Sequence, residues 1–311
     1  MSARVLIGSR SFGTTFPEHF DALRDAGFEV LPNEHGRAYR AAELLERLPE
    51  VDVIVTGTDE LTAEVIAAAP RLRAIVKHGV GLDSVDVEAA RARGVTVTAT
   101  TGAMHDSVAD LAMALLLAVA RAVVPAHLGV VAGEWRPTTG MELRDRTLGL
   151  VGLGRIGREL AVRAQAFGMD VRAHDPYPDE AWAAGHGVVL GTLDDVIAAA
   201  DVVSLHAPGG PDGPLLDAAR IGRLRAGAIV INTSRGSLVD EAALARALRE
   251  GRLAGAGLDV FADEPPTGSP LLELDTVVLT PHVGGRTTDA QRRMGEQCVA
   301  DCIAALDQED R

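Results

Sequence analysis

The stretch of sequence that decides the fold is Thr147-Leu148-Gly149-Leu150-Val151-Gly152-Leu153-Gly154-Arg155-Ile156-Gly157. An apolar run leads into a glycine-rich turn and then into a helical pattern, which predicts a strand, a tight turn and a helix. Gly152 permits the tight turn, Gly154 lets the backbone approach a pyrophosphate, and Gly157 allows the helix to pack closely on the strand. The start of the helix offers unpaired N–H groups and the positive end of its dipole to an anion.

The next strand along the chain supports a dinucleotide site. Residues 170–174 form a strand candidate that ends at Asp175. The acid that binds the ribose of a dinucleotide is expected about 20 residues after the glycines, and Asp175 lies near that spacing. A carboxylate can accept hydrogen bonds from both ribose hydroxyls, whereas it repels a 2′-phosphate. The two signals together predict a dinucleotide cofactor, and they favour NAD over NADP.

Strands and helices alternate on both sides of this stretch. Helical patterns at 41–48 and 61–68 separate strands of the first hundred residues, a long apolar helix spans about 107–124, and a final helix spans about 287–306. The strand candidates are 4–7, 30–31, 51–55, 74–77, 95–98, 147–151, 170–174, 202–205, 228–231, 255–259 and 277–279. This rhythm is typical of parallel sheets covered by helices. We therefore expect an α/β protein with two doubly wound sheets in tandem.

Composition limits the classes of function. The chain has 311 residues, enough for two domains, and a net charge of −14, which argues against nucleic acid and against an anionic membrane surface as partners. The most apolar stretch, 111–120, is too short to span a bilayer, and the N-terminus lacks the features of a secretory signal. Cys298 and Cys302 lie four apart without partner ligands, so no metal site is expected. A reducing cytoplasm fits best.

Three polar segments beyond the glycine turn are candidates for the chemistry. Arg235, Glu264 and His282 each follow a different strand candidate, at the edge where open α/β sheets bind ligands. A guanidinium suits a substrate carboxylate, and histidine suits proton transfer near neutral pH. A nearby carboxylate raises the pKa of the histidine. Each residue alone is more often a surface group, but together they predict reduction of a 2-oxo acid or oxidation of a 2-hydroxy acid.

The chain resembles the D-isomer-specific 2-hydroxyacid dehydrogenase family along nearly its whole length, most closely its short phosphoglycerate dehydrogenase-like members. The motifs that carry the resemblance are GVGLDSVD (79–86), SVADLAMALLLAVAR (107–121), GLGRIG (152–157), INTSRGSLVDEAAL (231–244), GLDVFADEPP (257–266) and TPHVGGRT (280–287). The resemblance implies a central Rossmann NAD domain (103–285), a discontinuous flavodoxin-like substrate domain (1–102 plus 286–311), a cleft between them and a homodimer.

The resemblance also implies roles for single residues. It assigns substrate binding to Arg235, tuning of the histidine pKa to Glu264 and acid–base catalysis to His282. It also implies that the backbone at Val80 and Gly81 holds the substrate carboxylate. The residues expected to contact NAD are Gly152, Gly154, Arg155, Ile156, Gly157, Asp175, Ala207, Thr233, Asp259, His282, Gly284 and Gly285. A basic residue at the place of Lys77 holds the substrate phosphate in phosphoglycerate dehydrogenases, and Arg10 lies on the same side of its sheet. The alternative is that Lys77 and Arg10 are solvated charges at the rim.

Some features depart from the family pattern or leave the function open. Asp110 stands where many members have Glu, and the chain ends at Arg311, where longer members continue into a regulatory domain, so serine feedback is not expected. His206 is interpreted as structural. A hydroxypyruvate or glyoxylate reductase and an NAD-sensing corepressor-type binding protein are alternatives to a phosphate- or phosphonate-specific enzyme. Glu264 argues against a formate dehydrogenase, where Gln is usual, and the motif order excludes an L-type lactate or malate dehydrogenase.

Overall fold

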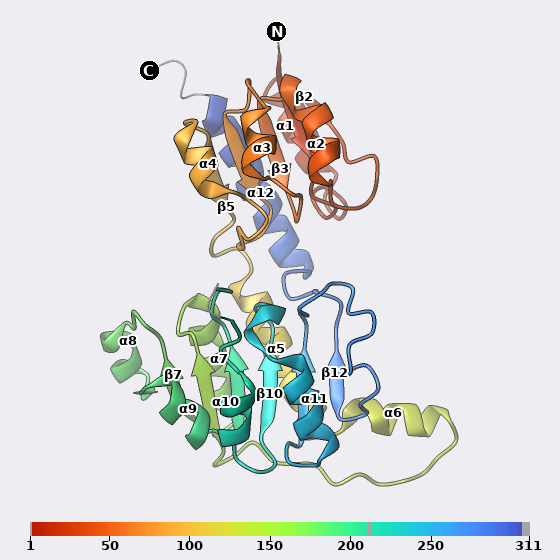
Figure 1. Cartoon of the computed structure of the whole chain (residues 1–311), viewed down its shortest axis with the longest axis vertical. Helices are drawn as coiled ribbons and strands as arrows, with labels where there is room; N and C mark the ends of the chain where they lie inside the picture. Colours follow the sequence, from red (N-terminus) through yellow and green to blue (C-terminus); the bar gives the residue numbers. More distant parts are fainter. Residues whose placement is uncertain (1, 211–212, 307–311) are drawn as a thin grey trace. The chain divides into compact units, whose positions relative to one another are not determined.

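Two units make up the fold, each built around its own parallel sheet (Figure 1). The computed structural model describes residues 2–210 and 213–306. Unit 1 combines Met1–Met104 with Gly285–Arg311, and unit 2 is His105–Gly284. The predicted α/β class with two doubly wound parallel sheets is therefore confirmed.

Unit 1 has a five-stranded sheet in the order β2-β1-β3-β4-β5, the flavodoxin-like order. Its strands are β1 (Ala3–Ile7), β2 (Phe28–Leu31), β3 (Val53–Thr56), β4 (Ala74–Lys77) and β5 (Thr96–Ala99). Its helices are α1 (Glu18–Asp25), α2 (Ala41–Arg47), the 3-10 turn η1 (Leu48–Glu50), α3 (Ala63–Ala67), α4 (Val87–Ala92) and α12 (Thr288–Leu306). One core cluster packs α2, α3 and α4 on one face, and a second packs α1 and α12 on the other. The last helix thus returns to the first sheet.

The two cysteines lie in the core of unit 1. Cys298 and Cys302 are fully buried on the face of α12 that packs against Val5, Val53 and Val76. Both thiols are free. Burial raises the pKa of Cys298 well above its ordinary value and that of Cys302 to about 12, because an apolar core disfavours the thiolate. They serve as small apolar side chains.

Unit 2 has a seven-stranded sheet in the order β12-β11-β10-β9-β6-β7-β8. Its strands are β6 (Thr147–Val151), β7 (Asp170–His174), β8 (Val189–Leu190), β9 (Val202–Leu205), β10 (Ile229–Asn232), β11 (Gly255–Leu258) and β12 (Val277–Leu279). Its helices are α5 (His105–Ala120), α6 (Val123–Val131), α7 (Arg155–Ala166), α8 (Glu180–Gly185), α9 (Leu193–Ala199), α10 (Ala218–Arg223) and α11 (Glu241–Arg249), with a 3-10 turn η2 (Gly236–Leu238).

Alternation along the strands builds one core on each face of this sheet. Val203 and Leu205 join the cluster with α10 and α11, whereas Val202 joins the cluster with α5 and α7. Both faces are therefore covered, as expected for parallel strands that are apolar throughout. Consecutive pairing of β6, β9, β10, β11 and β12 places the loops after these strands along one edge.

The long predicted helix at 107–124 is wrong at its C-terminal end. The helix α5 ends at Ala120, and Ala122 has a left-handed backbone (φ 49°), so α6 leaves at a bend of 63°. Periodicity alone continues through such a break, because the residues on both sides are apolar. The short edge strand β8 was also missed.

The helix α6 is left uncovered by the rest of unit 2, since none of its residues is buried. Its apolar side chains are open to solvent, with Leu128 60% and Val131 71% exposed, and Trp135 beyond it is 89% exposed. Figure 1 shows α6 extending from the body of unit 2. Within the described residues no single helix is long and apolar enough to cross a membrane, although the bent pair of α5 and α6 meets the criteria of length and composition.

Candidate active site

The glycine turn has the geometry that a dinucleotide requires. Gly152 has φ +99°, and a Cβ there would lie 2.6 Å from the His206 carbonyl oxygen. A Cβ on Gly157 would lie 2.3 Å from the Gly152 carbonyl oxygen, whereas one on Gly154 would meet open space. Gly154 precedes α7 without any side-chain cap, so the first N–H groups of the helix, at Arg155 and Ile156, remain available to a ligand.

Asp175 is fixed by the backbone beside this turn. One carboxylate oxygen accepts the Leu153 N–H at 2.8 Å, and the other accepts the Tyr177 N–H at 2.8 Å. The Gly152 N–H donates to the His174 carbonyl at 2.8 Å. The acid at the end of β7 is therefore held against the glycine turn, as the spacing in the sequence predicts, and its remaining lone pairs can accept from ribose hydroxyls.

Buried polar atoms without partners lie after β9 and β10. Among the described residues, the Thr233 hydroxyl and His206 Nδ1 are buried and make no hydrogen bond. The other ring nitrogen of His206 lies 2.8 Å from the Ser204 hydroxyl, and burial lowers the pKa of His206 to about 4. The Ala207 carbonyl accepts from the Ser234 hydroxyl at 2.5 Å. Unmatched polar atoms after two neighbouring strands, one of them at His206 beside the glycine turn, fit a site for a polar ligand, so the residues present suit NAD.

Asp259 organises the loop after β12. Its carboxylate is 1% exposed and accepts from the Val283 and Gly284 N–H groups at 2.8 Å each and from the Thr280 hydroxyl at 2.6 Å. The His282 N–H donates to the Asp259 carbonyl at 2.9 Å. These bonds hold His282 in a left-handed conformation with φ +53°, which is uncommon for a residue with a side chain. The sequence analysis assigned Asp259 only to cofactor contact and missed its role in holding the loop that carries His282.

The ring of His282 faces Glu264. Its Nδ1 lies 2.8 Å from Glu264 Oε2, and the Phe261 N–H donates to Glu264 Oε1 at 3.2 Å. The hydrogen bond to Glu264 raises the pKa of His282, and the charges of Glu264 and Asp259 raise it further. Burial lowers the pKa but does not outweigh these contacts. Burial alone would raise the pKa of Glu264, but the hydrogen bond and charge of His282 lower it overall. The pair therefore favours imidazolium beside carboxylate.

Arg235 lies in the same unit, directly after β10. Its guanidinium donates to the Ser234 carbonyl at 2.7 Å, and its positive charge acts on the pKa of both Glu264 and His282. The structure thus brings Arg235, Glu264 and His282 into one electrostatic neighbourhood, although each follows a different strand. An arginine beside a protonated histidine forms a positive site suited to an anionic substrate.

Gly284 and Gly285 complete the loop after His282. The Gly284 carbonyl accepts from the Ser107 hydroxyl at 2.5 Å, which ties the loop to the start of α5. Gly285 begins the second part of unit 1, and its carbonyl accepts from Gln291 at 3.0 Å.

The candidate substrate residues Arg10, Lys77, Val80 and Gly81 belong to unit 1. Lys77 is only 7% exposed, and its ammonium donates to the Gly57 carbonyl, so the alternative that Lys77 is a solvated rim charge does not hold. Arg10 is exposed. Val80 is 43% exposed and follows Gly79, whose N–H donates to the Thr100 hydroxyl at 3.0 Å. The candidate substrate loop 78–81 is thus anchored at Gly79 and open to solvent at Val80.

His78, between Lys77 and this loop, is buried beside two serines. Its Nδ1 lies 3.1 Å from the Ser11 hydroxyl and 3.3 Å from the Ser9 hydroxyl. Burial lowers the pKa of His78 to about 4, and the charges of His19, Lys77 and Arg286 act in the same direction. His78 is therefore neutral at physiological pH.

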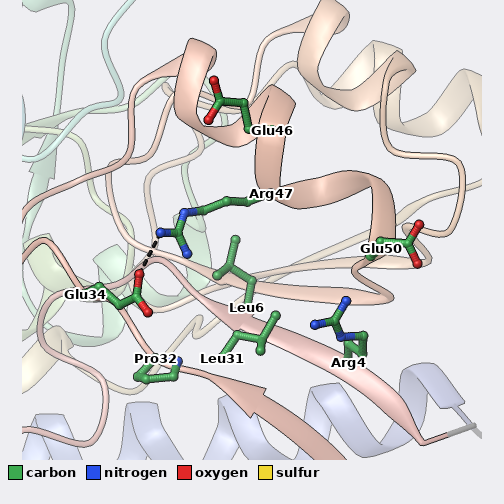
Figure 2. A pocket seen from close by; sticks show the side chains of 8 residues that line it. All are labelled: Arg4, Leu6, Leu31, Pro32, Glu34, Glu46, Arg47 and Glu50. Carbon is green, nitrogen blue, oxygen red and sulfur yellow. Dashed lines mark hydrogen bonds and ion pairs between the residues drawn. The ribbon is translucent and has the colours of Figure 1, made fainter.

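A surface depression of about 300 Å³ lies between β1, β2 and α2 (Figure 2). Arg47 pairs with Glu34 at 2.7 Å, and Arg4 pairs with Glu29 at 3.1 Å. Both arginines that line the depression are thus paired with acids of unit 1, and we assign no ligand to the depression. In unit 2, His105, Asp106 and Glu159 lie close enough to share a metal ion, but the Arg163 guanidinium already contacts Glu159 at 2.6 Å and Asp106 at 3.3 Å.

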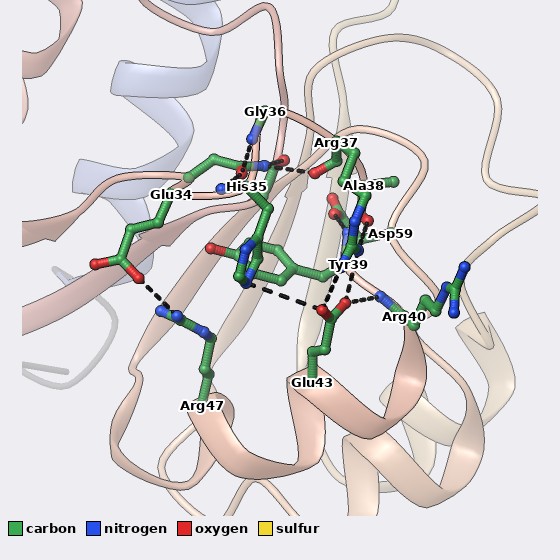
Figure 3. Close-up of polar contacts among 12 residues, drawn as sticks. Glu34, His35, Gly36, Arg37, Ala38, Tyr39, Arg40, Glu43, Arg47 and Asp59 are labelled. Atoms are coloured by element: carbon green, nitrogen blue, oxygen red, sulfur yellow. Dashed lines mark hydrogen bonds and ion pairs between the residues drawn. The ribbon is translucent and has the colours of Figure 1, made fainter.

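A polar network after β2 has a structural role (Figure 3). Glu43 accepts from the Arg37 guanidinium at 2.8 and 2.5 Å and from the Arg40 N–H at 2.9 Å, and the Arg37 bond lowers the pKa of Glu43 to about 2. Asp59 accepts from the Tyr39 and Gly57 N–H groups at 2.7 and 2.9 Å. The network caps α2 and fixes the turn at Gly57 that receives Lys77.

Comparison with known proteins identifies the family. Residues 113–284 match the family described as "D-isomer specific 2-hydroxyacid dehydrogenase, NAD binding domain". The hydroxypyruvate reductase of Thermotoga maritima is 42% identical over 264 residues, which cover 83% of this chain and 85% of that protein. The chain belongs to the D-isomer-specific 2-hydroxyacid dehydrogenase family.

Two further proteins are similar to this chain. The D-3-phosphoglycerate dehydrogenase of Mycobacterium leprae is 46% identical over 269 residues, covering 85% of this chain and 51% of that protein. The crystal structure of the TT0316 protein from Thermus thermophilus superposes with a TM-score of 0.89 at 41% identity, covering 98% of this chain and 97% of that one. The chain spans about half the length of the phosphoglycerate dehydrogenases it matches, and the residues that match the model of the NAD-binding domain, 113–284, lie within unit 2.

Proposed function

We propose that this chain is an NAD-dependent oxidoreductase that interconverts a small D-2-hydroxy acid and its 2-oxo acid. The observation that carries the proposal is the 2.8 Å contact between His282 Nδ1 and Glu264 Oε2, beside Arg235 and in the domain that binds the cofactor. Family membership supports the same reaction, and the phosphoglycerate dehydrogenase and hydroxypyruvate reductase names of the relatives fall within it.

Three side chains of unit 2 would divide the work of reduction. Arg235 holds the substrate carboxylate through its planar fork of N–H donors. His282 donates a proton to the ketone oxygen from Nε2, because Nδ1 is directed at Glu264. Glu264 raises the pKa of the imidazole and so favours its protonated form, and in the oxidative direction the neutral His282 accepts the proton of the alcohol. When bound, NAD supplies the hydride transfer at the substrate C2.

Replacement of His282 tests this function. His282→Ala should lower kcat by about 10²- to 10⁴-fold, the usual effect of losing a general acid, on every 2-oxo acid that the wild-type chain reduces. NADH oxidation with phosphohydroxypyruvate, hydroxypyruvate, glyoxylate, pyruvate and phosphonopyruvate gives the rates, and NADH fluorescence gives the affinity for cofactor, which should hardly change. His35→Ala, at an exposed histidine of unit 1, is the control. A near-normal kcat for His282→Ala would show that another group donates the proton.

For the substrate we propose a 2-oxo or 2-hydroxy acid with a second anionic group, a phosphate or phosphonate, as in 3-phosphoglycerate. The support is Lys77 beside the substrate loop 78–81, with Arg10 exposed after β1, and the name of the phosphoglycerate dehydrogenase relatives. The alternative is a hydroxypyruvate or glyoxylate reductase, which the Thermotoga relative favours.

We also propose that the chain forms a homodimer through α6. Every other helix of eight or more residues within the described chain buries part of its surface, whereas α6 leaves Val123, Leu128, Val130 and Val131 more than half exposed. A second copy would cover this apolar surface with the same surface, as in a twofold interface. The two free thiols fit a reducing compartment, and we propose the cytoplasm.

A further inference from the structure

One carboxylate holds the Glu264 segment at both ends. Glu241 is the first residue of α11, and its Oε1 accepts the Ala262 N–H at 2.8 Å. Its Oε2 accepts the Ser269 hydroxyl at 2.6 Å. Ala262 precedes Glu264 by two residues and Ser269 follows it by five, so a single side chain on a helix fixes both flanks of the loop that carries Glu264. Hydrogen bonds to a carboxylate are among the stronger ones in proteins.

The position of Glu264 depends on this segment. Glu264 is exposed, and its own contacts are the Phe261 N–H at 3.2 Å and His282 Nδ1 at 2.8 Å. The charged groups with the largest effects on the pKa of His282 are Glu264, Asp259 and Arg235. Glu241 is not one of these groups, so it reaches His282 through the geometry of the loop rather than through its own charge.

We propose that Glu241 is a positioning residue, which pins Ala262 and Ser269 and thereby keeps the Glu264 carboxylate against His282. The proposal deepens the proposed function and rests on it for the catalytic meaning of the His282–Glu264 contact. The contact itself, however, is a property of the folded chain and can be measured without any substrate.

Two variants separate the loop contacts from the charge of Glu241. Glu241→Ala removes both contacts. Glu241→Gln keeps both, because the amide oxygen can accept from Ala262 while the amide N–H donates to the Ser269 oxygen. Histidine-labelled protein without cofactor is titrated by NMR, with the His282 signal assigned from its loss in His282→Gln. We expect Glu241→Ala to lower the pKa of His282 toward its ordinary value, and Glu241→Gln to leave it near that of the wild type.

Glu180 provides a matched control. It is the first residue of α8 and follows the capping Asp179, just as Glu241 follows the capping Asp240. Glu180 is exposed, and within residues 2–210 and 213–306 its carboxylate has no hydrogen-bond partner. Glu180→Ala therefore removes the same helix-terminal charge without touching the loop, and it should leave the titration of His282 unchanged. Ser269→Ala removes only one of the two contacts, and it replaces Glu241→Ala as the test variant if Glu241→Ala does not fold.

Kinetics then show whether the contact matters for turnover. On the basic side of the pH profile for reduction, kcat/KM of Glu241→Ala should fall about three- to ten-fold, with little change on the acidic side. An unchanged His282 titration in folded Glu241→Ala, or in Ser269→Ala if that is the one that folds, would overturn the proposal. An equal decrease in Glu241→Gln would overturn it too, since charge alone would then be responsible. A wild-type chain that reduces no 2-oxo acid contradicts the proposed function but leaves the NMR result intact.

Discussion

His282 is held from two directions, its backbone by Asp259 and its ring by Glu264. The first contact fixes where the imidazole lies, and the second fixes its charge. In the proposed mechanism, reduction requires a protonated His282. Because Glu264 raises the pKa of His282, the carboxylate would extend the pH range in which His282 can donate a proton. The main-chain carbonyl of Asp259 therefore holds the backbone of His282, whereas the Glu264 carboxylate has the largest effect on the pKa of the ring.

Replacement of the Glu264 carboxylate separates charge from shape. Glu264→Gln retains an acceptor for Nδ1–H but loses the negative charge, so His282 should release its proton at lower pH. We expect the basic limb of the profile of kcat/KM against pH for reduction to move to lower pH, with activity retained at the acidic end. Asp263→Asn, at the neighbouring exposed acid, should leave the limb in place. A Glu264→Gln profile identical to that of the wild type would remove Glu264 from this role.

Asp175 is expected to select NAD over NADP, and it also holds the backbone of the glycine turn. Asp175→Ser removes the charge that repels a 2′-phosphate, and we expect the ratio of kcat/KM for NADH over NADPH to fall about ten- to a hundred-fold. Because the Leu153 and Tyr177 N–H groups lose their acceptors, the KM for NADH should rise and the Tm should fall. Asp170→Ser, at the exposed start of β7, is the control. A wild-type preference for NADPH would contradict this assignment.

Single residues were predictable from sequence where they belong to local motifs. The glycine turn and Asp175 have a fixed spacing, and the structure places them in contact. Glu241 and Ser269 could not be found in this way, because they lie 28 residues apart and meet only after α11 packs beside the loop. The same reason applies to Asp259, whose bonds to Val283 and Gly284 cross 24 and 25 residues.

At the scale of elements, strands buried on both faces were the easiest to predict. The bounds of β4, β6 and β9, which are short apolar runs between turns, agree with the sequence prediction. Those of β7 and β12 agree as well, although β7 is polar at alternate positions. The helix at 107–124 was not predicted correctly, because nothing in its apolar pattern marks the left-handed Ala122. Two-residue strands such as β8 are too short for alternation to be visible.

Lys77, the last residue of β4, is the residue on which the proposed choice of substrate depends. If Lys77 binds a second anionic group, Lys77→Ala should lower kcat/KM for a phosphorylated substrate about ten- to a hundred-fold, since each charge-assisted bond is worth roughly 1.5–3 kcal/mol. Pyruvate and glyoxylate should hardly be affected. Arg73→Ala, at the partly exposed residue before this strand, provides a comparison. Equal losses on both kinds of substrate would show that Lys77 supports the turn at Gly57 instead.

At the scale of the whole molecule, the exposed apolar surface of α6 is the feature that a single chain does not explain. Leu128→Glu places a charge in the proposed twofold interface, and we expect the dimer dissociation constant to rise about 100-fold or more, because the charge would be buried without a partner. Sedimentation equilibrium measures it. Phe167→Glu changes an apolar residue of similar exposure, 46%, elsewhere in unit 2, and should not dissociate the dimer. A wild-type chain that sediments as a monomer would contradict the proposal.

The distribution of two rare residue types gives each unit its own spectroscopic reporter. Both cysteines, Cys298 and Cys302, lie in the core of unit 1, whereas both tryptophans, Trp135 and Trp182, belong to unit 2. Thiol-reactive dyes label a buried cysteine only when its surroundings open, so their rate of reaction follows the unfolding of unit 1. Tryptophan emission follows unit 2 through Trp182, because Trp135 is already 89% exposed in the folded chain. The unmodified chain therefore allows the order in which its two sheets unfold to be observed without any introduced label.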